Sequence, residues 1–219
     1  SRLPDPVVVR PTNFEPKEYR RLIGGNQFED IFDSQGPDLR GTRRYLSEPY
    51  GEAFALECEA FRRVRYEHGF NNLHLMMPYC EQPAQAEAVM GLLERTGLKR
   101  GEEGFRVYLC CDYAANWTLA QEFAGLFDGF SLDVRKLQRW VRSTGAGAGD
   151  AGKTMGKALE KMLDACHAAG GTVTVRGRLL VDASALVALL VKVGVDAVSV
   201  NPEAIPRVME WIVDAESAM

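Results

Sequence analysis

The stretch Phe127-Asp-Gly-Phe-Ser-Leu-Asp-Val-Arg-Lys-Leu137 sets the interpretation of the whole chain. It is an apolar run that ends in a cluster of charge, formed by Asp133, Arg135 and Lys136. In proteins where strands alternate with helices, ligands gather at the carboxyl ends of parallel strands. The stretch therefore predicts a strand, then a helix, and a candidate functional site where the two meet.

Working outward, six short apolar runs have the composition of buried strands. These runs are Pro6–Arg10, Leu73–Pro78, Phe105–Cys111, Phe127–Leu132, Thr172–Arg176 and Val195–Val200. Helix-like segments separate most of them, which favours a parallel sheet with right-handed crossovers. Residues 11–44 are rich in Pro, Gly, Asn and Asp and predict a long, functional loop. At 219 residues, the chain is expected to form a single α/β domain over residues 1–219.

Several helix boundaries can be predicted from local signals. Ser47 is expected to cap a helix whose buried stripe is Ala53, Leu56, Ala60 and Val64. Another helix is expected over residues 116–126. Asp182 is expected to cap a nearly all-apolar helix that continues to Val193, and that composition predicts extensive burial.

Composition argues against several classes of protein. The formal net charge of −4 gives no reason to expect nucleic acid or an anionic membrane as a partner. No apolar run reaches the length of a membrane span, and Ser1-Arg2-Leu3-Pro4 does not resemble a signal peptide. The five cysteines include no C-x-x-C pair, which predicts buried free thiols in a reducing cytoplasm.

Two local signals favour structural interpretations. Gly147-Ala-Gly-Asp-Ala-Gly-Lys-Thr154 fits a phosphate-binding loop pattern, but such a loop needs a buried strand before it. The preceding residues 139–144 are polar and helix-like, so a flexible connector is the better interpretation. The histidines His68, His74 and His167 have no neighbour at ligand or triad spacing and are interpreted as structural.

Charged residues at the ends of the predicted strands form the strongest signal. If the sheet closes or curves, these side chains face a common space. The set comprises Arg10, Arg40, Asp112, Asp133, Arg135, Lys136 and Arg176. It is mostly cationic, and convergent Arg and Lys suit a small anion such as a carboxylate or phosphate.

The order and spacing of these segments resemble the C-terminal phosphoenolpyruvate/pyruvate-binding barrel of the phosphoenolpyruvate synthase (pyruvate, water dikinase) family. The segments that carry the resemblance are Val9–Phe14, Glu18-Tyr19, Leu22–Gly25, Leu39–Tyr45, Ala53–Cys58, Met77–Cys80, Cys110–Asp112 with Asn116, Phe127–Ser131 and Val198–Pro202. The resemblance implies a parallel, TIM-barrel-like (β/α) domain. About six β/α units are present, so the barrel is expected to be incomplete, with its first two strands missing.

Carried over residue by residue, the resemblance implies roles for five positions. Arg10 and Arg40 match substrate-clamping arginines, and Asp112 matches an acidic magnesium ligand. Lys136 stands where the family has a second metal-binding Asp, and Arg176 stands where it has a catalytic cysteine.

These departures imply that the family's reaction is absent. The family holds magnesium with two carboxylates, and here Lys136 replaces one of them with an ammonium. No cofactor is therefore expected unless Asp133 restores coordination beside Asp112. Arg176 cannot donate a proton in place of a cysteine, because a guanidinium stays protonated.

The first hypothesis is therefore a repurposed barrel that binds a small anionic metabolite without magnesium or cysteine chemistry. In it, Arg10, Arg40, Arg135 and Arg176 bind the substrate, while Asp112 and Lys136 are the candidate catalytic residues. Such a protein could be a metal-independent biosynthetic enzyme. One alternative is a non-catalytic scaffold subunit of a split assembly, and another is an active dikinase-type phosphotransferase component. A homodimer or a partner chain is expected to cover the open edges of the sheet.

Overall fold

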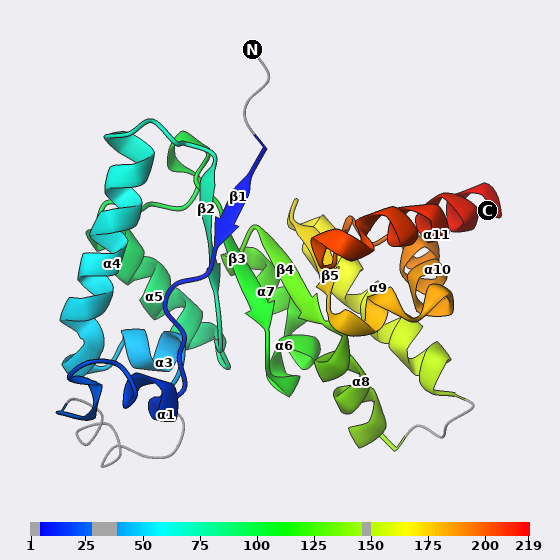
Figure 1. Ribbon diagram of the computed structural model, residues 1–219, viewed down its shortest axis with the longest axis horizontal. Helices are drawn as coiled ribbons and strands as arrows, with labels where there is room; N and C mark the ends of the chain where they lie inside the picture. The colour runs from blue at the N-terminus through cyan, green and yellow to red at the C-terminus, as the bar shows by residue number, and fades with distance from the viewer. Residues whose placement is uncertain (1–4, 28–38, 146–149) are drawn as a thin grey trace. The chain divides into compact units, whose positions relative to one another are not determined.

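The computed structural model describes residues 5–27, 39–145 and 150–219, and the chain divides into two compact units, Ser1–Leu109 and Cys110–Met219 (Figure 1). The elements that begin in the first unit are β1 (Val7–Val9), α1 (Pro16–Tyr19), α3 (Thr42–Tyr45), α4 (Glu48–Tyr66), β2 (Leu73–Met77), α5 (Pro83–Arg95), η1 (Glu102–Gly104) and β3 (Val107–Cys111). Those of the second unit are α6 (Ala114–Thr118), α7 (Ala120–Leu126), β4 (Gly129–Asp133), α8 (Val134–Ser143), α9 (Ala151–Ala168), β5 (Thr172–Arg176), η2 (Arg178–Val181), α10 (Ser184–Val193), β6 (Ala197–Ser199), η3 (Pro202–Ala204) and α11 (Ile205–Ser217).

All six predicted strands are present, within a few residues of their expected bounds. In the first unit β1 pairs with β2 and β2 with β3, always in parallel. In the second unit β4 pairs with β5 and β5 with β6, again in parallel. The predicted parallel β/α fold is confirmed. The single domain over residues 1–219 stays a prediction.

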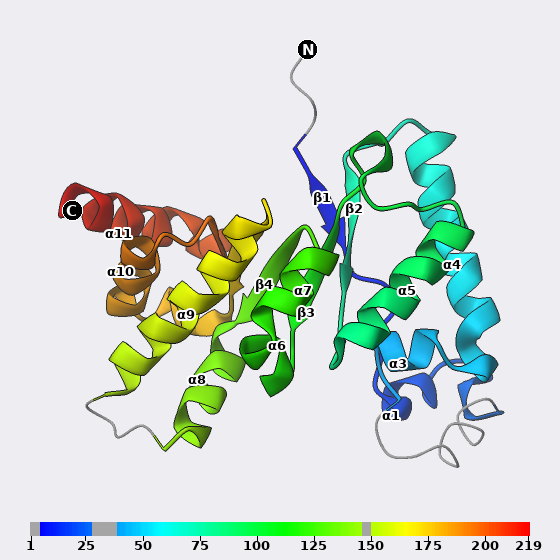
Figure 2. The same cartoon turned by 180° about the vertical axis from the view of Figure 1, so that it is seen from behind.

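The first unit packs α4 and α5 beside the strand β2, as both ribbon views show (Figure 1, Figure 2). Its core contains Phe54 of α4, Leu75 of β2 and Val89 of α5, all fully buried. Arg65 of α4 is also buried, and its guanidinium donates to the backbone carbonyl of Leu73 and, at 2.6 Å, to that of Asn71. These bonds give the buried cation carbonyl partners and fix the end of α4 against the start of β2.

The prediction of a long loop over residues 11–44 is only partly right, because the short helix α1 lies within it and α3 begins near its end. The Arg44 guanidinium sits between two aromatic rings, 3.8 Å from the Tyr19 centroid and 4.6 Å from that of Tyr50. Tyr45 stacks on Phe54 with ring centroids 4.2 Å apart, and burial raises the pKa of its hydroxyl well above the ordinary range. Aromatic packing, rather than helical periodicity, orders this segment.

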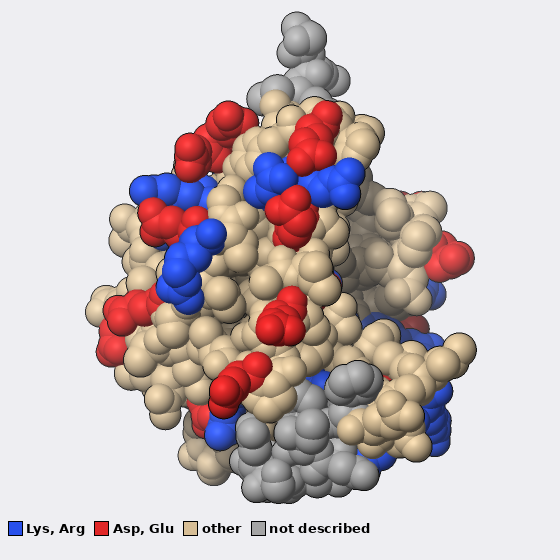
Figure 3. Space-filling model, turned by 90° about the vertical axis from the view of Figure 1, so that its left-hand side faces the viewer, with Lys and Arg blue, Asp and Glu red and all other residues tan. Residues whose placement is uncertain are grey.

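Helix α4 differs in detail from its prediction. Leu56 is 73% exposed, and the buried positions are Phe54, Cys58 and Arg65. Ser47 takes the N-cap position, but its hydroxyl donates to the Arg44 carbonyl at 2.7 Å instead of capping the helix. On the face that Figure 3 shows, basic and acidic side chains of the described residues are interspersed.

The second unit places the carboxyl ends of its strands in register. Asp133 at the end of β4 is the partner of Arg176 at the end of β5, and Arg176 is the partner of Ser199 in β6. Strand β4 is buried along nearly its whole length, which explains its apolar sequence. The parallel register thus brings the charged residues after two strands to one edge.

Two helix predictions in this unit are wrong. The helix expected over residues 116–126 is two helices, α6 and α7, because Leu119 leaves the helical conformation between them. Only Val187 and Leu190 of α10 are buried, so that apolar helix is less covered than expected. The Asp182 side chain is 82% exposed and does not cap α10, whose N-cap position is Ala183.

Other predictions can be compared directly with the described residues. Helix α8, not a strand, precedes the glycine-rich segment, which argues against a phosphate-binding loop. The flexible connector predicted over residues 147–154 is wrong for residues 151–154, which form the start of α9, and residues 147–149 lie outside the described residues. The five cysteines are all free and buried, as predicted. In the part of the chain that the structure describes, no helix combines the length and apolarity that a membrane crossing requires.

Candidate functional site

The site is built around an ion pair between Asp112 and Lys136. Asp112 follows directly after β3, and Lys136 lies in the first turn of α8. The Lys136 Nζ atom donates to Oδ1 of Asp112 at 2.5 Å. The Asp112 side chain is only 3% exposed and that of Lys136 is 26% exposed. A carboxylate this deeply buried needs a cation beside it, and Lys136 supplies one.

Arg176 joins this pair to the end of β4. Its guanidinium donates to Ser131 Oγ at 3.1 Å and to Asp133 Oδ2 at 3.3 Å. Its Nη2 atom lies 3.9 Å from Asp112 Oδ1 and donates to Cys110 Sγ at 3.8 Å. Arg176 therefore contacts residues at the ends of β3 and β4 from its own place at the end of β5.

Asp133 acts as the N-cap of α8. Its Oδ1 atom accepts from the backbone N–H groups of Arg135, at 2.9 Å, and Lys136, at 3.3 Å. A carboxylate at this position also complements the helix dipole. The cap fixes the first turn of α8, and with it the backbone of Lys136. The two oxygen atoms of Asp133 are thus held by the helix and by Arg176.

We use the name strand-end cluster for four residues, Asp112, Asp133, Lys136 and Arg176. It contains two carboxylates and two cations in mutual contact, so its formal charge is balanced. The sequence predicts a mostly cationic set, and the structure instead brings together a neutral one. A ligand that enters this cluster has to compete with existing ion pairs.

The remaining predicted substrate-binding residues lie elsewhere. Arg135 is exposed and contributes its backbone N–H to the cap of α8. Arg10 is exposed after β1, in the first unit. Arg40, also in the first unit, pairs with Glu15 at 3.2 Å and lies 4.5 Å above the Tyr79 ring. The structure thus brings Asp112, Lys136 and Arg176 together, and their roles in binding stay predictions.

A pocket of about 220 Å³ opens beside the strand-end cluster. One face of α8 supplies Lys136, Arg139, Trp140 and Ser143, at the spacing i, i+3, i+4 and i+7. Asp112 and Trp117 line it from the β3–α6 side, and the Trp117 and Trp140 rings stack with centroids 6.0 Å apart. The pocket combines an ion pair, a further guanidinium and an aromatic wall.

Sequence reasoning missed the part that Arg139, Trp117 and Trp140 play in this pocket. Trp140 is half-buried, unlike Leu137 and Val141 of the same helix, which are buried. The available signal was its helical spacing from Lys136. A tryptophan and an arginine one turn after a site lysine share its face of the helix.

The donor set does not fit magnesium. Magnesium takes oxygen ligands in near-octahedral geometry. At this site the ammonium of Lys136 contacts Asp112 Oδ1, and Asp133 is held by two backbone N–H groups and Arg176. Among residues 5–27, 39–145 and 150–219, no three His, Cys, Asp or Glu side chains are grouped so as to hold a metal ion.

The cysteines near the cluster are poorly placed for chemistry. Cys110 and Cys111 are fully buried, and burial raises the pKa of the Cys111 thiol well above its ordinary value. A thiol of raised pKa in an apolar environment is a poor nucleophile, because the thiolate is the reactive form.

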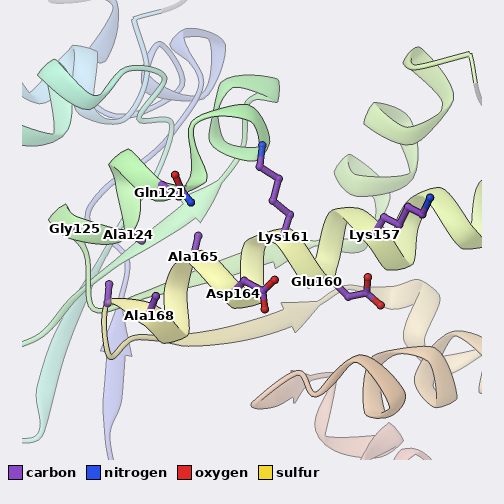
Figure 4. A pocket seen from close by; sticks show the side chains of 10 residues that line it. Gln121, Ala124, Gly125, Lys157, Glu160, Lys161, Asp164, Ala165 and Ala168 are labelled. Carbon is purple, nitrogen blue, oxygen red and sulfur yellow. The ribbon is translucent and has the colours of Figure 1, made fainter.

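A larger hollow of about 650 Å³ lies between α7 and α9 (Figure 4). Small residues such as Ala124, Gly125 and Ala165 form its floor, and charges of both signs from α9 surround it. Lys161 is already used, because its Nζ donates to the Thr118 carbonyl at 3.3 Å. None of the predicted site residues lines this hollow, and its mixed charges and open form indicate an ordinary interhelical groove.

The chain is similar to known proteins over nearly its whole length. Residues 4–217 match the family described as the PEP-binding domain of PEP-utilising enzymes. The chain is 34% identical over 223 residues to a phosphoenolpyruvate synthase of Synechocystis, covering 99% of this chain and 27% of that protein. It is 35% identical over 222 residues to the phosphoenolpyruvate synthase of Escherichia coli, covering 97% of this chain and 28% of the relative.

The chain therefore spans about a quarter of the length of these relatives. Among solved structures, a pyruvate kinase from Cryptosporidium parvum superposes with a TM-score of 0.52 at 13% identity, covering 72% of this chain and 34% of that one. At that identity the likeness concerns the fold alone, and it agrees with a parallel β/α architecture. The match over nearly its whole length shows that the chain belongs to the family of PEP-binding domains of PEP-utilising enzymes.

Proposed function

We propose that this domain binds a small anionic metabolite, a carboxylate, a 2-oxo acid or a phosphorylated acid, without magnesium and without cysteine chemistry. The observation that carries the proposal is the ion pair between Lys136 and Asp112 at 2.5 Å. It places an ammonium against Asp112, the carboxylate that the family resemblance matches to a magnesium ligand. The names of the relatives, all phosphoenolpyruvate synthases, favour phosphoenolpyruvate and pyruvate as the first ligands to test.

The cations of the site are suited to oxygen anions even though they are paired. A guanidinium carries five N–H donors, more than the three hydrogen bonds that Arg176 makes with Ser131, Asp133 and Cys110. Arg139 adds a second guanidinium on the pocket wall. A bidentate contact with a carboxylate or phosphate suits the planar fork of either arginine.

If the domain is an enzyme, the same residues can stabilise a developing oxyanion. An enolate formed from a 2-oxo acid carries negative charge that Lys136 and Arg176 would balance. Asp112 is the carboxylate within reach of that position and is the candidate base. Substrate carboxylates further from the reacting atoms would be held by Arg139, and the binding roles of Arg10 and Arg40 stay predictions.

Isothermal titration calorimetry tests binding directly. We expect phosphoenolpyruvate, pyruvate or oxalate to bind the wild-type chain with EDTA present, with no gain from added magnesium. The Arg176→Met variant should bind roughly 10- to 100-fold more weakly, because a hydrogen bond to a charged group contributes about 1.5–3 kcal/mol. Arg142→Met, which removes an exposed arginine in the last turn of α8, is the control and should bind normally. Binding that requires magnesium, or no binding at all, would overturn the proposal.

A non-catalytic scaffold role is the second candidate, and one feature favours it. Helix α11 exposes Ile205, Met209 and Val213, each about half exposed and spaced four residues apart. An uncovered apolar stripe of this kind is typical of a surface that contacts another chain. We propose that a second copy or a partner chain covers it.

Sedimentation equilibrium distinguishes these possibilities. A stable oligomer of the wild-type chain that becomes monomeric in Met209→Glu, with ligand binding absent, would favour the scaffold role. A monomer that binds pyruvate would count against it. The exposed residue Glu210 of the same helix gives a matched control in Glu210→Gln.

A further inference from the structure

We propose that Lys136 forms a covalent imine with the ketone carbon of a 2-oxo acid. This inference rests on the proposed function, because it needs a 2-oxo acid to enter the pocket beside the strand-end cluster. It narrows the substrate class to 2-oxo acids and makes Lys136 a nucleophile that forms a covalent bond with the substrate. The observations that carry it are the position of Lys136, its carboxylate partner and the lining of the pocket.

Lys136 is placed as a nucleophilic lysine would be. Lys136 lies just after the carboxyl end of strand β4 and lines a pocket of about 220 Å³. Its side chain is 26% exposed. Amine nucleophiles of this kind attack carbonyl substrates to give Schiff bases. The first turn of α8 is fixed by the Asp133 cap, so the lysine backbone is held in one place.

The carboxylate that imine chemistry requires is already in contact. Asp112 Oδ1 accepts from Lys136 Nζ at 2.5 Å, and the Asp112 side chain is only 3% exposed. A buried carboxylate at hydrogen-bond distance can take the proton that the ammonium must lose and later return it. Arg176 lies 3.9 Å from the same oxygen, so a cation remains beside Asp112 while Lys136 reacts.

The pocket wall matches the rest of a small 2-oxo acid. Arg139 offers a guanidinium for the substrate carboxylate, and the indoles of Trp117 and Trp140 offer an apolar surface for a methyl or short alkyl group. The volume suits a substrate of a few carbon atoms and is below the usual range for larger ligands.

The step is balanced without an oxidant or a metal. Asp112 takes one proton from the Lys136 ammonium, and the neutral amine attacks the ketone carbon, so that a C–N bond forms and the C=O π bond breaks. Proton transfer from nitrogen to oxygen gives a neutral carbinolamine. Asp112 then returns its proton to the carbinolamine hydroxyl, which leaves as water. Ammonium and ketone have become iminium and water, and Asp112 is a carboxylate again.

Borohydride trapping tests the proposal. Sodium borohydride is added to the full chain in the presence of pyruvate, and the product is analysed by intact-mass and peptide mass spectrometry. We expect one reduced pyruvate adduct per chain, located on Lys136. Oxalate, an anion of similar size that has no ketone, should slow the trapping by competition and form no adduct itself.

Three variants sharpen the test. Lys136→Arg keeps a cation beside Asp112 and should abolish the adduct while the circular dichroism spectrum stays unchanged. Asp112→Asn should slow trapping by roughly 100-fold or more, in line with the usual contribution of a positioned acid–base group. Lys157→Arg, on the exposed face of α9, should trap at the wild-type rate.

Two results would overturn the imine. One is pyruvate binding by calorimetry without any adduct, which leaves the proposed anion-binding function standing. The other is an adduct spread over exposed lysines at similar rates in the wild-type and Lys136→Arg chains. Absence of calorimetric binding for every acid tested would instead remove the proposed function itself, so the two failures are distinguishable.

Discussion

The two ends of the strands in the second unit each carry a carboxylate paired with a basic side chain, and the two pairs differ in burial. At the carboxyl ends, Asp112 is 3% exposed and bonds to Lys136, which is 26% exposed. At the amino ends, Asp196 and His167 are 33% and 44% exposed and lie 2.8 Å apart. The first pair lines a pocket, whereas the second pair connects the last turn of α9 to the segment before β6.

The difference separates a candidate site from a structural contact. Asp196 also accepts from the backbone N–H of Val173 at 2.7 Å, so its carboxylate closes the start of the sheet. Residues at the amino ends of parallel barrel strands serve stability, and those at the carboxyl ends serve ligands. The histidine expected to be structural therefore has a clear structural partner, and the lysine expected in the site has a buried carboxylate.

The largest expected effect is on stability at the carboxyl ends. Lys136→Met removes the closest cation from a buried carboxylate, and we expect a loss of about 2–3 kcal/mol, somewhat below the range for fully buried pairs because Lys136 is partly exposed. His167→Gln, at the amino ends, should cost less than about 1 kcal/mol, because both partners are solvated. Urea denaturation of the two variants measures both losses.

A double variant checks the reason for that loss. Lys136→Met combined with Asp112→Leu removes both charges and should recover most of the stability, because the main penalty is an uncompensated buried carboxylate. Equal losses for Lys136→Met and His167→Gln would show that burial does not separate the two pairs.

The end of strand β4 shows which features of the site could be predicted from the sequence and which could not. Of the charge cluster after Phe127–Leu132, Asp133 and Lys136 meet other strand-end residues, as expected where parallel strands place their carboxyl ends at one edge, whereas the Arg135 side chain is exposed. The sequence did not predict that Asp133 would cap α8 and also bond Arg176. Such double use depends on the register between β4 and β5, which pairs Asp133 with Arg176 across the sheet.

Helix burial was predicted less well than strand order. The helix from Ser184 to Val193 is apolar enough to be buried on every side, yet only two of its residues are. Periodicity identifies an apolar helix but does not show which neighbour covers it. Likewise, the ordering of Tyr19, Arg44 and Tyr50 by cation–π stacking joins residues far apart in the sequence and leaves no periodic signal.

A smaller effect at the carboxyl ends separates the two tasks of Asp133. Asp133→Ala removes the cap of α8 and should cost about 1–2 kcal/mol. Asp133→Asn keeps an acceptor for the helix N–H groups and loses only the charge beside Arg176, so we expect a cost of about 0.5 kcal/mol. Chemical denaturation compares them. Equal costs would mean that the ion pair, and not the cap, is the main contribution.

The effect that depends on pH belongs to the amino ends. Burial raises the pKa of the Asp196 carboxyl, but hydrogen bonds from His167 and the Val173 N–H outweigh it, so the net pKa is lowered. A carboxyl whose pKa is lower in the folded chain stabilises the fold above its unfolded pKa, near pH 4. That contribution is lost as the pH falls through the lowered folded value.

Asp196→Asn should therefore be less stable than the wild type by about 1 kcal/mol at neutral pH. The gap should shrink as the pH falls below about 4, because the wild-type carboxylate then takes up a proton and loses the same interactions. Asp182→Asn, at a side chain that is 82% exposed, should show a smaller gap at every pH. A pH-independent gap for Asp196→Asn would place its contribution in packing rather than in charge, and the amino-end pair would then no longer be an electrostatic counterpart of the strand-end cluster.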